Sequence, residues 1–164
     1  MAMVGKKTGF QSRAVVQLGD PGEYRLMEPL SFFDGLRTTY LVEKGFITDF
    51  ASIPRLLRAL PSFDPSGVSR EPAILHDRLY CGHGRIGATV YQPASEDDEQ
   101  PWVSVNKVLT RAEADALFHR ALLAVGMSPL AAWFHYLGVR MGGWIYWTDR
   151  AEGLESSDFN RSDQ

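Results

Sequence analysis

Four polar residues stand in apolar surroundings, and their types are those of a water-activating site. Asp49 follows the run GFIT, His76 and Asp77 stand within PAILHDRLY, and Asp115 stands within RAEADALF. An imidazole can take a proton from water while a carboxylate fixes its tautomer through the other ring nitrogen. The remaining carboxylates, with backbone carbonyls, could hold a hard cation that polarises a substrate carbonyl. Oxygen ligands favour Ca²⁺ or Mg²⁺ over zinc in such a site.

The helical residues of this set also have structural interpretations when each is taken alone. The adjacent His76 and Asp77 could be a satisfied structural pair in the core. Asp115 could pair on its own helix with His119, four residues on, or with Arg111, four residues back. The functional and the structural interpretations therefore both stay open when each residue is taken alone.

The loop residues and the aromatic residues have similar alternatives. Asp49 could accept backbone hydrogen bonds in an Asx-turn, and Ser52, two positions before a proline, is interpreted as a local cap. An aromatic-rich stretch could line an acyl pocket or lie at an interface, although aromatic residues at helical spacing are more often core. It contains Trp133, Phe134, Trp144, Tyr146 and Trp147.

The first third of the chain predicts the strands that would position Asp49. The runs SRAVVQL, EYRLMEPLSFF and TTYLVEKGFI are rich in β-branched and aromatic residues, and the turn signals GDPGE and DGLR separate them. Short strands joined by tight turns favour an antiparallel meander or a pair of hairpins.

Three helices are expected after the strands. Serine as N-cap and proline in the first turn predict a helix over residues 69–81, with glycines after it. Thr110 and Glu113 form a capping box before RAEADALFHRALLAVG, which predicts the second helix. Ser128 followed by Pro129 opens the third, PLAAWFHYLGVRMGG.

The expected fold is α+β, with an N-terminal antiparallel strand meander packed on about three helices. We expect one domain over residues 1–150, because 164 residues suit a single core. Strands should dominate residues 1–50 and helices residues 53–150, with a long loop near 82–108 that has room for one hairpin. Residues 151–164 are expected to be a mobile polar tail.

Composition restricts the classes of function. A net charge of −3, with scattered Lys and Arg, gives no basic surface for nucleic acid. The one cysteine, Cys81, rules out an internal disulfide and favours folding in the cytoplasm. The N-terminus does not resemble a secretion signal. We expect no transmembrane segment, because His135 and Arg140 interrupt the apolar stretch from Pro129 to Trp147.

The combination of GFITDFASIP, AILHDRLY and TRAEADALF resembles an uncharacterised family of small proteins from tailed bacteriophages and prophages. The resemblance covers roughly residues 20–145. It implies a phage or prophage origin, and with it a place in the cytoplasm of the producing bacterium or in the virion. It implies no particular activity.

The same motifs are similar in type and order to the bacterial and fungal branch of phospholipase A2. That family has a T-D-x-C-type loop, a helix with C-x-x-H-D-x-x-Y, a helix with R-x-x-x-D-x-x-F and a later aromatic-rich helix. Here TDFAS, LHDRLY, RAEADALF and AAWFHYLGVRMGG stand in that order. The resemblance implies a phospholipase A2-like helix pair in which His76 is the general base, Asp115 orients it and Tyr80 hydrogen-bonds within the pair.

The resemblance also implies a calcium site formed by Asp77, Asp49 and the carbonyl of Phe50. Two cysteine positions of that family are Ala51 and Ala73 here, so its disulfides are absent. Packing of the strands must then hold the helices, and the longer segment between the His-Asp helix and the next helix could cover or reshape the cleft.

Three functions follow as expectations. The first is a Ca²⁺-dependent hydrolase of a lipid or other ester. The second is a non-enzymatic virion or tail-associated protein that binds other virion proteins and keeps the same polar core. The third is a transition-metal phosphohydrolase that uses His76, Asp77 and Asp115 with His83 or His119.

Overall fold

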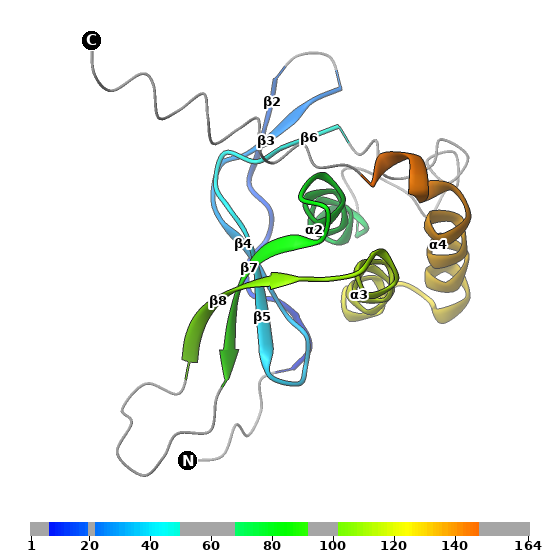
Figure 1. Ribbon diagram of the computed structural model, residues 1–164. Helices are drawn as coiled ribbons and strands as arrows, with labels where there is room; N and C mark the ends of the chain where they lie inside the picture. The colour runs from blue at the N-terminus through cyan, green and yellow to red at the C-terminus, as the bar shows by residue number, and fades with distance from the viewer. Residues whose placement is uncertain (1–6, 20–21, 50–67, 92–101, 148–164) are drawn as a thin grey trace.

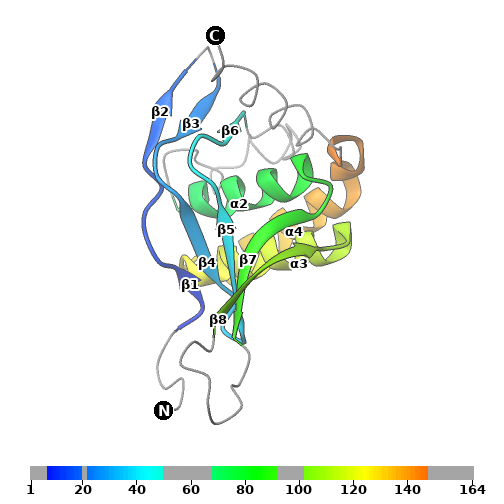
Figure 2. The same ribbon diagram turned by 60° about the vertical axis from the view of Figure 1, so that its left-hand side comes forward.

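Antiparallel strands form one layer of the molecule, and α-helices cover one side of it (Figure 1). The computed structural model describes residues 7–19, 22–49, 68–91 and 102–147. Within them lie eight strands in two sheets and three α-helices, and Figure 2 shows the three helices behind the larger sheet. The expected α+β class is confirmed.

All strand pairs in both sheets are antiparallel. The larger sheet has, in spatial order, β1 (Gly9–Phe10), β4 (Leu30–Phe33), β5 (Thr38–Val42), β7 (Arg85–Tyr91) and β8 (Trp102–Val108). The smaller sheet has the order β2 (Val16–Leu18), β3 (Tyr24–Leu26) and β6 (Ile47–Thr48). The meander therefore divides, because β5 pairs with β7 while β6 leaves to pair with β3.

The turn between β4 and β5 shows how a short sequence signal fixes the register. The Asp34 Oδ1 atom accepts hydrogen bonds from the backbone N–H groups of Leu36, Arg37 and Thr38 at 2.8, 3.0 and 3.0 Å. Gly35 has φ +81°, which glycine adopts without a steric penalty. The DGLR signal thus forms an Asx-type turn that places Phe32 opposite Tyr40.

The segment near 82–108, expected as a long loop with room for a hairpin, contains β7 and β8. These strands pair from Arg85 opposite Val108 to Tyr91 opposite Trp102. The residues between them, 92–101, lie outside the described part of the chain, as does the tail at 151–164. The hairpin supplies two of the five strands of the larger sheet.

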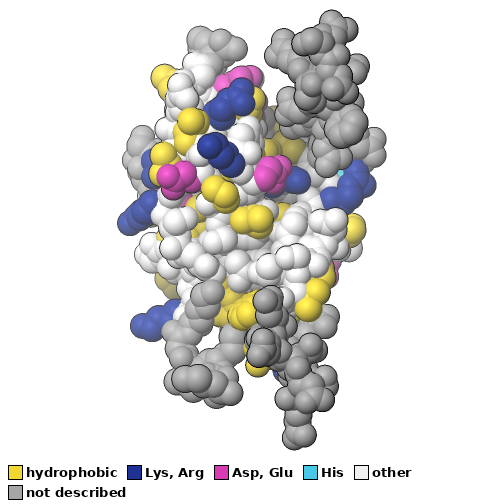
Figure 3. Space-filling model, turned by 90° about the vertical axis from the view of Figure 1, so that its left-hand side faces the viewer, with side chains coloured by type: hydrophobic (Ala, Val, Ile, Leu, Met, Phe, Trp, Pro, Cys, Tyr) yellow, Lys and Arg dark blue, Asp and Glu magenta, His cyan; other side chains and the backbone are white. Residues whose placement is uncertain are grey.

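The sheet face that turns away from the helices carries both polar and apolar side chains. Figure 3 shows uncharged polar and backbone atoms over much of this face, with scattered hydrophobic and charged side chains. A hollow on it is lined by polar and apolar residues together: Ser31, Thr39, Thr89, Ser104 and Asn106 with Leu41, Gly87, Ala88 and Val105. An antiparallel sheet commonly packs one face on the core and leaves the other to solvent, as here.

The three helices begin and end close to the expected positions. They are α2 (Arg70–Cys81), α3 (Arg111–Ala124) and α4 (Pro129–Gly142), and the short 3₁₀ helix η1 (Gly143–Tyr146) follows. The capping box of Thr110 and Glu113 is present, and the Ser128 hydroxyl accepts from the backbone N–H of Ala131 at 3.4 Å. Ser69 occupies the N-cap position of α2, but its side chain makes no capping hydrogen bond.

Helix α2 lies in the centre of the core. Its residues from Glu71 to Tyr80 are buried except for Arg78. Large apolar side chains surround it from the sheet and from α3, including Phe32, Ile86, Phe118 and Leu122. Because α2 is buried nearly all round, its polar residues need hydrogen-bond partners.

None of the helices in the described residues combines the length and apolar composition needed to cross a bilayer.

Candidate active site

A buried histidine and a buried aspartate meet where α2 packs on α3. The His76 Nε2 atom lies 3.0 Å from the Asp115 Oδ1 atom, and both side chains are 0% exposed. The two residues are 39 positions apart in the chain and lie on different helices. The structure thus brings together the pair that the sequence analysis named, and Asp115 engages the Nε2 nitrogen of the ring.

Tyr80 is the second donor to Asp115. It lies one turn after His76 on α2, so both side chains project toward α3. The Tyr80 hydroxyl donates to the Asp115 Oδ1 atom at 2.6 Å, as the helix-pair resemblance implied. The imidazole lies between two aromatic rings, with centroids 4.1 Å from Tyr80 and 4.6 Å from Phe118.

Two arginines approach the other oxygen of Asp115. The Arg140 Nη1 atom of α4 donates to Oδ2 at 2.9 Å, and the Arg111 Nη1 atom lies 3.7 Å from it. The alternative of a local pair with Arg111 is therefore present as well. Arg140 was missed as a site residue. Its position as a charged residue in an otherwise apolar helix was the signal that could have identified it.

These contacts determine the ionisation of the cluster formed by His76, Tyr80, Asp115 and Arg140, called here the His76 cluster. Burial raises the pKa of Asp115, but the hydrogen bonds from His76, Tyr80 and Arg140 outweigh burial and hold it below its ordinary value. Burial and the hydrogen bond to Asp115 raise the pKa of the Tyr80 phenol. The hydrogen bond to Asp115 raises the pKa of Arg140. Asp115 is therefore a carboxylate whose Oδ1 atom accepts from His76 and Tyr80 and whose Oδ2 atom accepts from Arg140, with Arg111 as a more distant ion-pair partner.

Asp77, adjacent to His76, is hydrogen-bonded to the last residue of β6. The Thr48 hydroxyl donates to the Asp77 Oδ2 atom, and both side chains are buried. Thr48 was not among the expected site residues, although it belongs to the TDFAS motif. Asp49 is exposed. Phe50 and Ser52 lie outside the described residues, so the calcium-binding carbonyl and the local cap stay predictions.

The donors around Asp77 suit a hard cation in kind. They are a carboxylate and a hydroxyl, with a second carboxylate, that of Asp49, one residue after Thr48. In the ranges that the structure describes, no three His, Cys, Asp or Glu side chains lie close enough together to hold a metal ion. The calcium site at Asp77 and Asp49 therefore stays a prediction.

Two of the other histidines, His83 and His119, have aromatic contacts. The His83 Nε2 atom accepts from the Trp147 indole N–H at 3.1 Å, and the His119 ring lies 5.5 Å from that of Tyr136. His135 is fully buried on α4.

The core interpretation of the aromatic stretch is wrong for part of it. Trp133, Phe134 and Trp144 are 48%, 50% and 66% exposed. Tyr146 and Trp147 are partly buried against the core. Helical spacing shows that these residues are apolar along most of the helix, but it does not tell which of them pack on the neighbouring helix and which face solvent.

Comparison with known protein families decides the classification. Residues 24–139 match the model of an uncharacterised family, described as a protein of unknown function (DUF1353). The chain belongs to this family. The match runs from the start of β3 into α4, so His76, Tyr80 and Asp115 lie within the DUF1353 region, and Arg140 lies one residue beyond it. Neither a curated protein nor a solved structure matches the chain.

Proposed function

We propose that this protein is a phage- or prophage-encoded, Ca²⁺-dependent hydrolase of an ester, similar to phospholipase A2. The observation that carries the proposal is the buried contact between His76 Nε2 and Asp115 Oδ1 at 3.0 Å, with Tyr80 on the same carboxylate oxygen. An orienting carboxylate on one ring nitrogen is what a histidine base needs in order to act through the other. The phage origin rests on the motif resemblance, and it places the protein in the cytoplasm of the producing bacterium or in the virion.

The reaction uses His76 Nδ1 as the base. Asp115 holds the proton on Nε2, so Nδ1 takes a proton from water as the water oxygen attacks the ester carbonyl. The resulting imidazolium is stabilised by the Asp115 carboxylate. The imidazolium then gives its proton to the leaving alkoxide when the carbon–oxygen bond breaks. Tyr80 and Arg140 fix the carboxylate, which keeps the imidazole in one orientation.

Calcium would bind beside this base. Asp77, which follows His76 directly, would hold it together with Asp49 and the Phe50 carbonyl. When bound, the ion supplies a positive charge that polarises the ester carbonyl. The Thr48 hydroxyl orients the Asp77 carboxylate through the hydrogen bond between them.

The test is fatty-acid release from phosphatidylglycerol and phosphatidylcholine vesicles, and hydrolysis of p-nitrophenyl acyl esters, with and without calcium. His76→Asn should lower kcat by about 10²-fold or more, because a positioned base contributes that much. Asp77→Asn should abolish the calcium stimulation. His119→Asn is the matched control and should keep full activity. Full activity in a folded His76→Asn or Asp77→Asn protein would end the proposal.

The second candidate is a non-enzymatic virion or tail-associated protein. It is favoured by the complete burial of the imidazole and by the use of both Asp115 oxygens in hydrogen bonds. Under this function His76→Asn lowers the melting temperature and particle assembly together, and the wild-type protein hydrolyses none of the esters. Mass spectrometry of purified phage particles should then detect the chain.

A further inference from the structure

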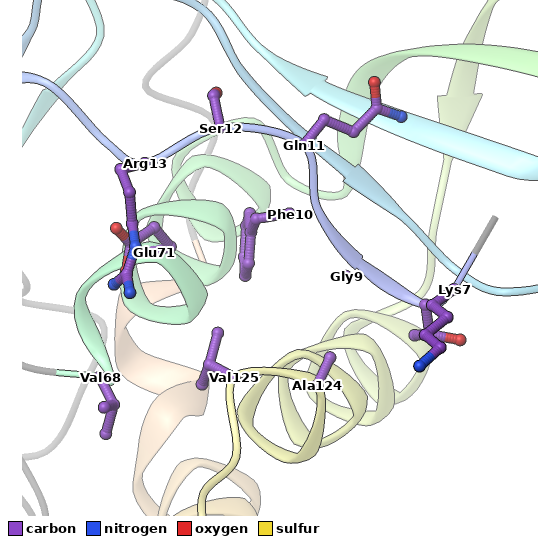
Figure 4. A pocket seen from close by; sticks show the side chains of 11 residues that line it. Lys7, Gly9, Phe10, Gln11, Ser12, Arg13, Val68, Glu71, Ala124 and Val125 are labelled. Atoms are coloured by element: carbon purple, nitrogen blue, oxygen red, sulfur yellow. The ribbon is translucent and has the colours of Figure 1, made fainter.

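A cavity separate from the His76 cluster lies between the N-terminal segment, the start of α2 and the end of α3. Its volume is about 540 Å³, within the range of small-molecule sites. Residues 7–13 form one wall, Val68 and Glu71 a second, and Ala124 and Val125 a third. Figure 4 shows these side chains around the cavity.

Glu71 supplies the feature that points to a ligand. The side chain is 2% exposed and lines the cavity. Its Oε1 atom accepts from the backbone N–H of Ala14 at 3.2 Å and from the Arg70 guanidinium at 3.4 Å. Its Oε2 atom is buried and has no hydrogen-bond partner in the described chain. A buried carboxylate oxygen without a donor is costly, so a donor from a ligand would be favourable here.

The rest of the lining indicates what else the ligand carries. Figure 4 shows Glu71 and Arg13 at one end of the cavity and Lys7 at the other. Phe10 and Val125 supply apolar wall between them, and Val68 supplies apolar wall below Glu71. One buried acceptor, neighbouring exposed cations and an apolar wall together suit a ligand with an ammonium group, a carboxylate and an apolar substituent.

We propose that this cavity binds a small zwitterion of the α-amino-acid class. The ligand ammonium donates to Glu71 Oε2, its carboxylate pairs with Arg13, and its apolar side chain packs on Phe10, Val68 and Val125. The proposal is independent of the hydrolase function, because none of these residues belongs to the His76 cluster.

The test is an NMR titration of the isotope-labelled full chain with L-leucine. L-leucine should give saturable shift changes at the backbone amides of Phe10, Ala14 and Val125. N-acetyl-L-leucine, which lacks the ammonium, and leucinamide, which lacks the carboxylate, should each bind about 10-fold more weakly or worse, since a hydrogen bond to a charged group is worth that much.

Variants locate the site. Glu71→Gln keeps a carbonyl for the Ala14 N–H but removes the negative charge, and it should raise the Kd for L-leucine about 10-fold or more. Arg13→Gln, at an exposed position, should weaken the binding of L-leucine but not that of leucinamide. Glu23→Gln, an exposed carboxylate outside the cavity lining, is the matched control and should leave the Kd unchanged. No saturable shift with L-leucine, or equal affinity in Glu71→Gln, would overturn the proposal.

Discussion

Asp115 is the residue on which hydrogen bonds from different helices converge. Its Oδ1 atom accepts from His76 and Tyr80 of α2, and its Oδ2 atom accepts from Arg140 of α4. A wholly buried carboxylate is tolerated only when such donors replace water. The same contacts therefore serve both candidate functions: they orient an imidazole, and they join three helices.

Tyr80→Phe should isolate one of these donors. The substitution keeps the aromatic ring against His76 and removes only the hydroxyl that lies 2.6 Å from Asp115 Oδ1. We expect the free energy of unfolding to fall by about 1–3 kcal/mol, because a buried hydrogen bond to a charged group is lost. Urea denaturation measures it. Tyr136→Phe, at a half-buried tyrosine of α4, is the control, and an equal loss in both variants would contradict the assigned role.

The sequence predicted which residues belong to the His76 cluster better than it predicted which of them contact one another. His76 and Asp115 stood out as polar residues in apolar surroundings, whereas Tyr80 was implied only by the resemblance to phospholipase A2. Residue types alone left Arg111 and His119 as alternative partners for Asp115. Only the resemblance to phospholipase A2 implied the pairing across the two helices. The sequence could mark Arg140 as a charged residue in an apolar helix but could not give its partner, because the contact with Asp115 depends on how α4 crosses α3.

Helix caps are the element-scale feature that the sequence predicts most directly. In α3 the Thr110 hydroxyl accepts a hydrogen bond from the backbone N–H of Glu113. The Glu113 carboxylate in turn accepts from the Thr110 backbone N–H at 2.7 Å. In α4 the corresponding hydrogen bond, from the Ala131 backbone N–H to the Ser128 hydroxyl, is 3.4 Å long. Thr110→Ala should cost about 1 kcal/mol of unfolding free energy, and Ser128→Ala less. Thermal or urea unfolding of both variants measures the two losses of unfolding free energy. A larger loss in Ser128→Ala than in Thr110→Ala would contradict this prediction.

Glycine at the junction of α4 and η1 is required by packing. A Cβ atom on Gly143 would lie 2.6 Å from the Tyr80 hydroxyl oxygen. Gly143→Ala should therefore displace Tyr80 from Asp115 and lower the unfolding free energy by about 1–3 kcal/mol, the usual cost of overpacking. Gly87→Ala is the control, because a Cβ there meets no atom within 4 Å. If the two variants unfold at the same urea concentration, this close approach does not constrain the fold.

Strand pairing shows where local signals stop being sufficient. The turn at Asp34 and the β-branched runs indicate β4 and β5 correctly. The pairing of β5 with β7 joins Thr39 to Thr89, and no local pattern specifies a partner at that separation. The segment near 82–108 was expected to have room for one hairpin, and β7 and β8 form it, but no local pattern specified that β7 would pair with β5.

At the scale of the whole molecule, two buried groups in the helical layer connect protonation to stability. Burial lowers the pKa of His135 below 6.5. The unfolded chain therefore binds a proton at this position at a higher pH than the folded chain does. The pKa of Asp115 is also lowered, from 3.8, with the same consequence at a lower pH. Protonation of either group as the pH falls below its unfolded pKa therefore favours the unfolded chain.

The unfolding free energy should thus decline in two separate pH windows. The first begins below about pH 6.5, where the unfolded His135 takes up a proton, and the second begins below about pH 3.8, where the unfolded Asp115 does so. Urea unfolding from pH 8 to pH 3 measures the decline. His135→Gln has no proton to bind at this position, so the difference between its profile and that of the wild type isolates this histidine. If both proteins lose stability equally between pH 7 and pH 5, His135 does not contribute to the first window, and the loss must come from other groups.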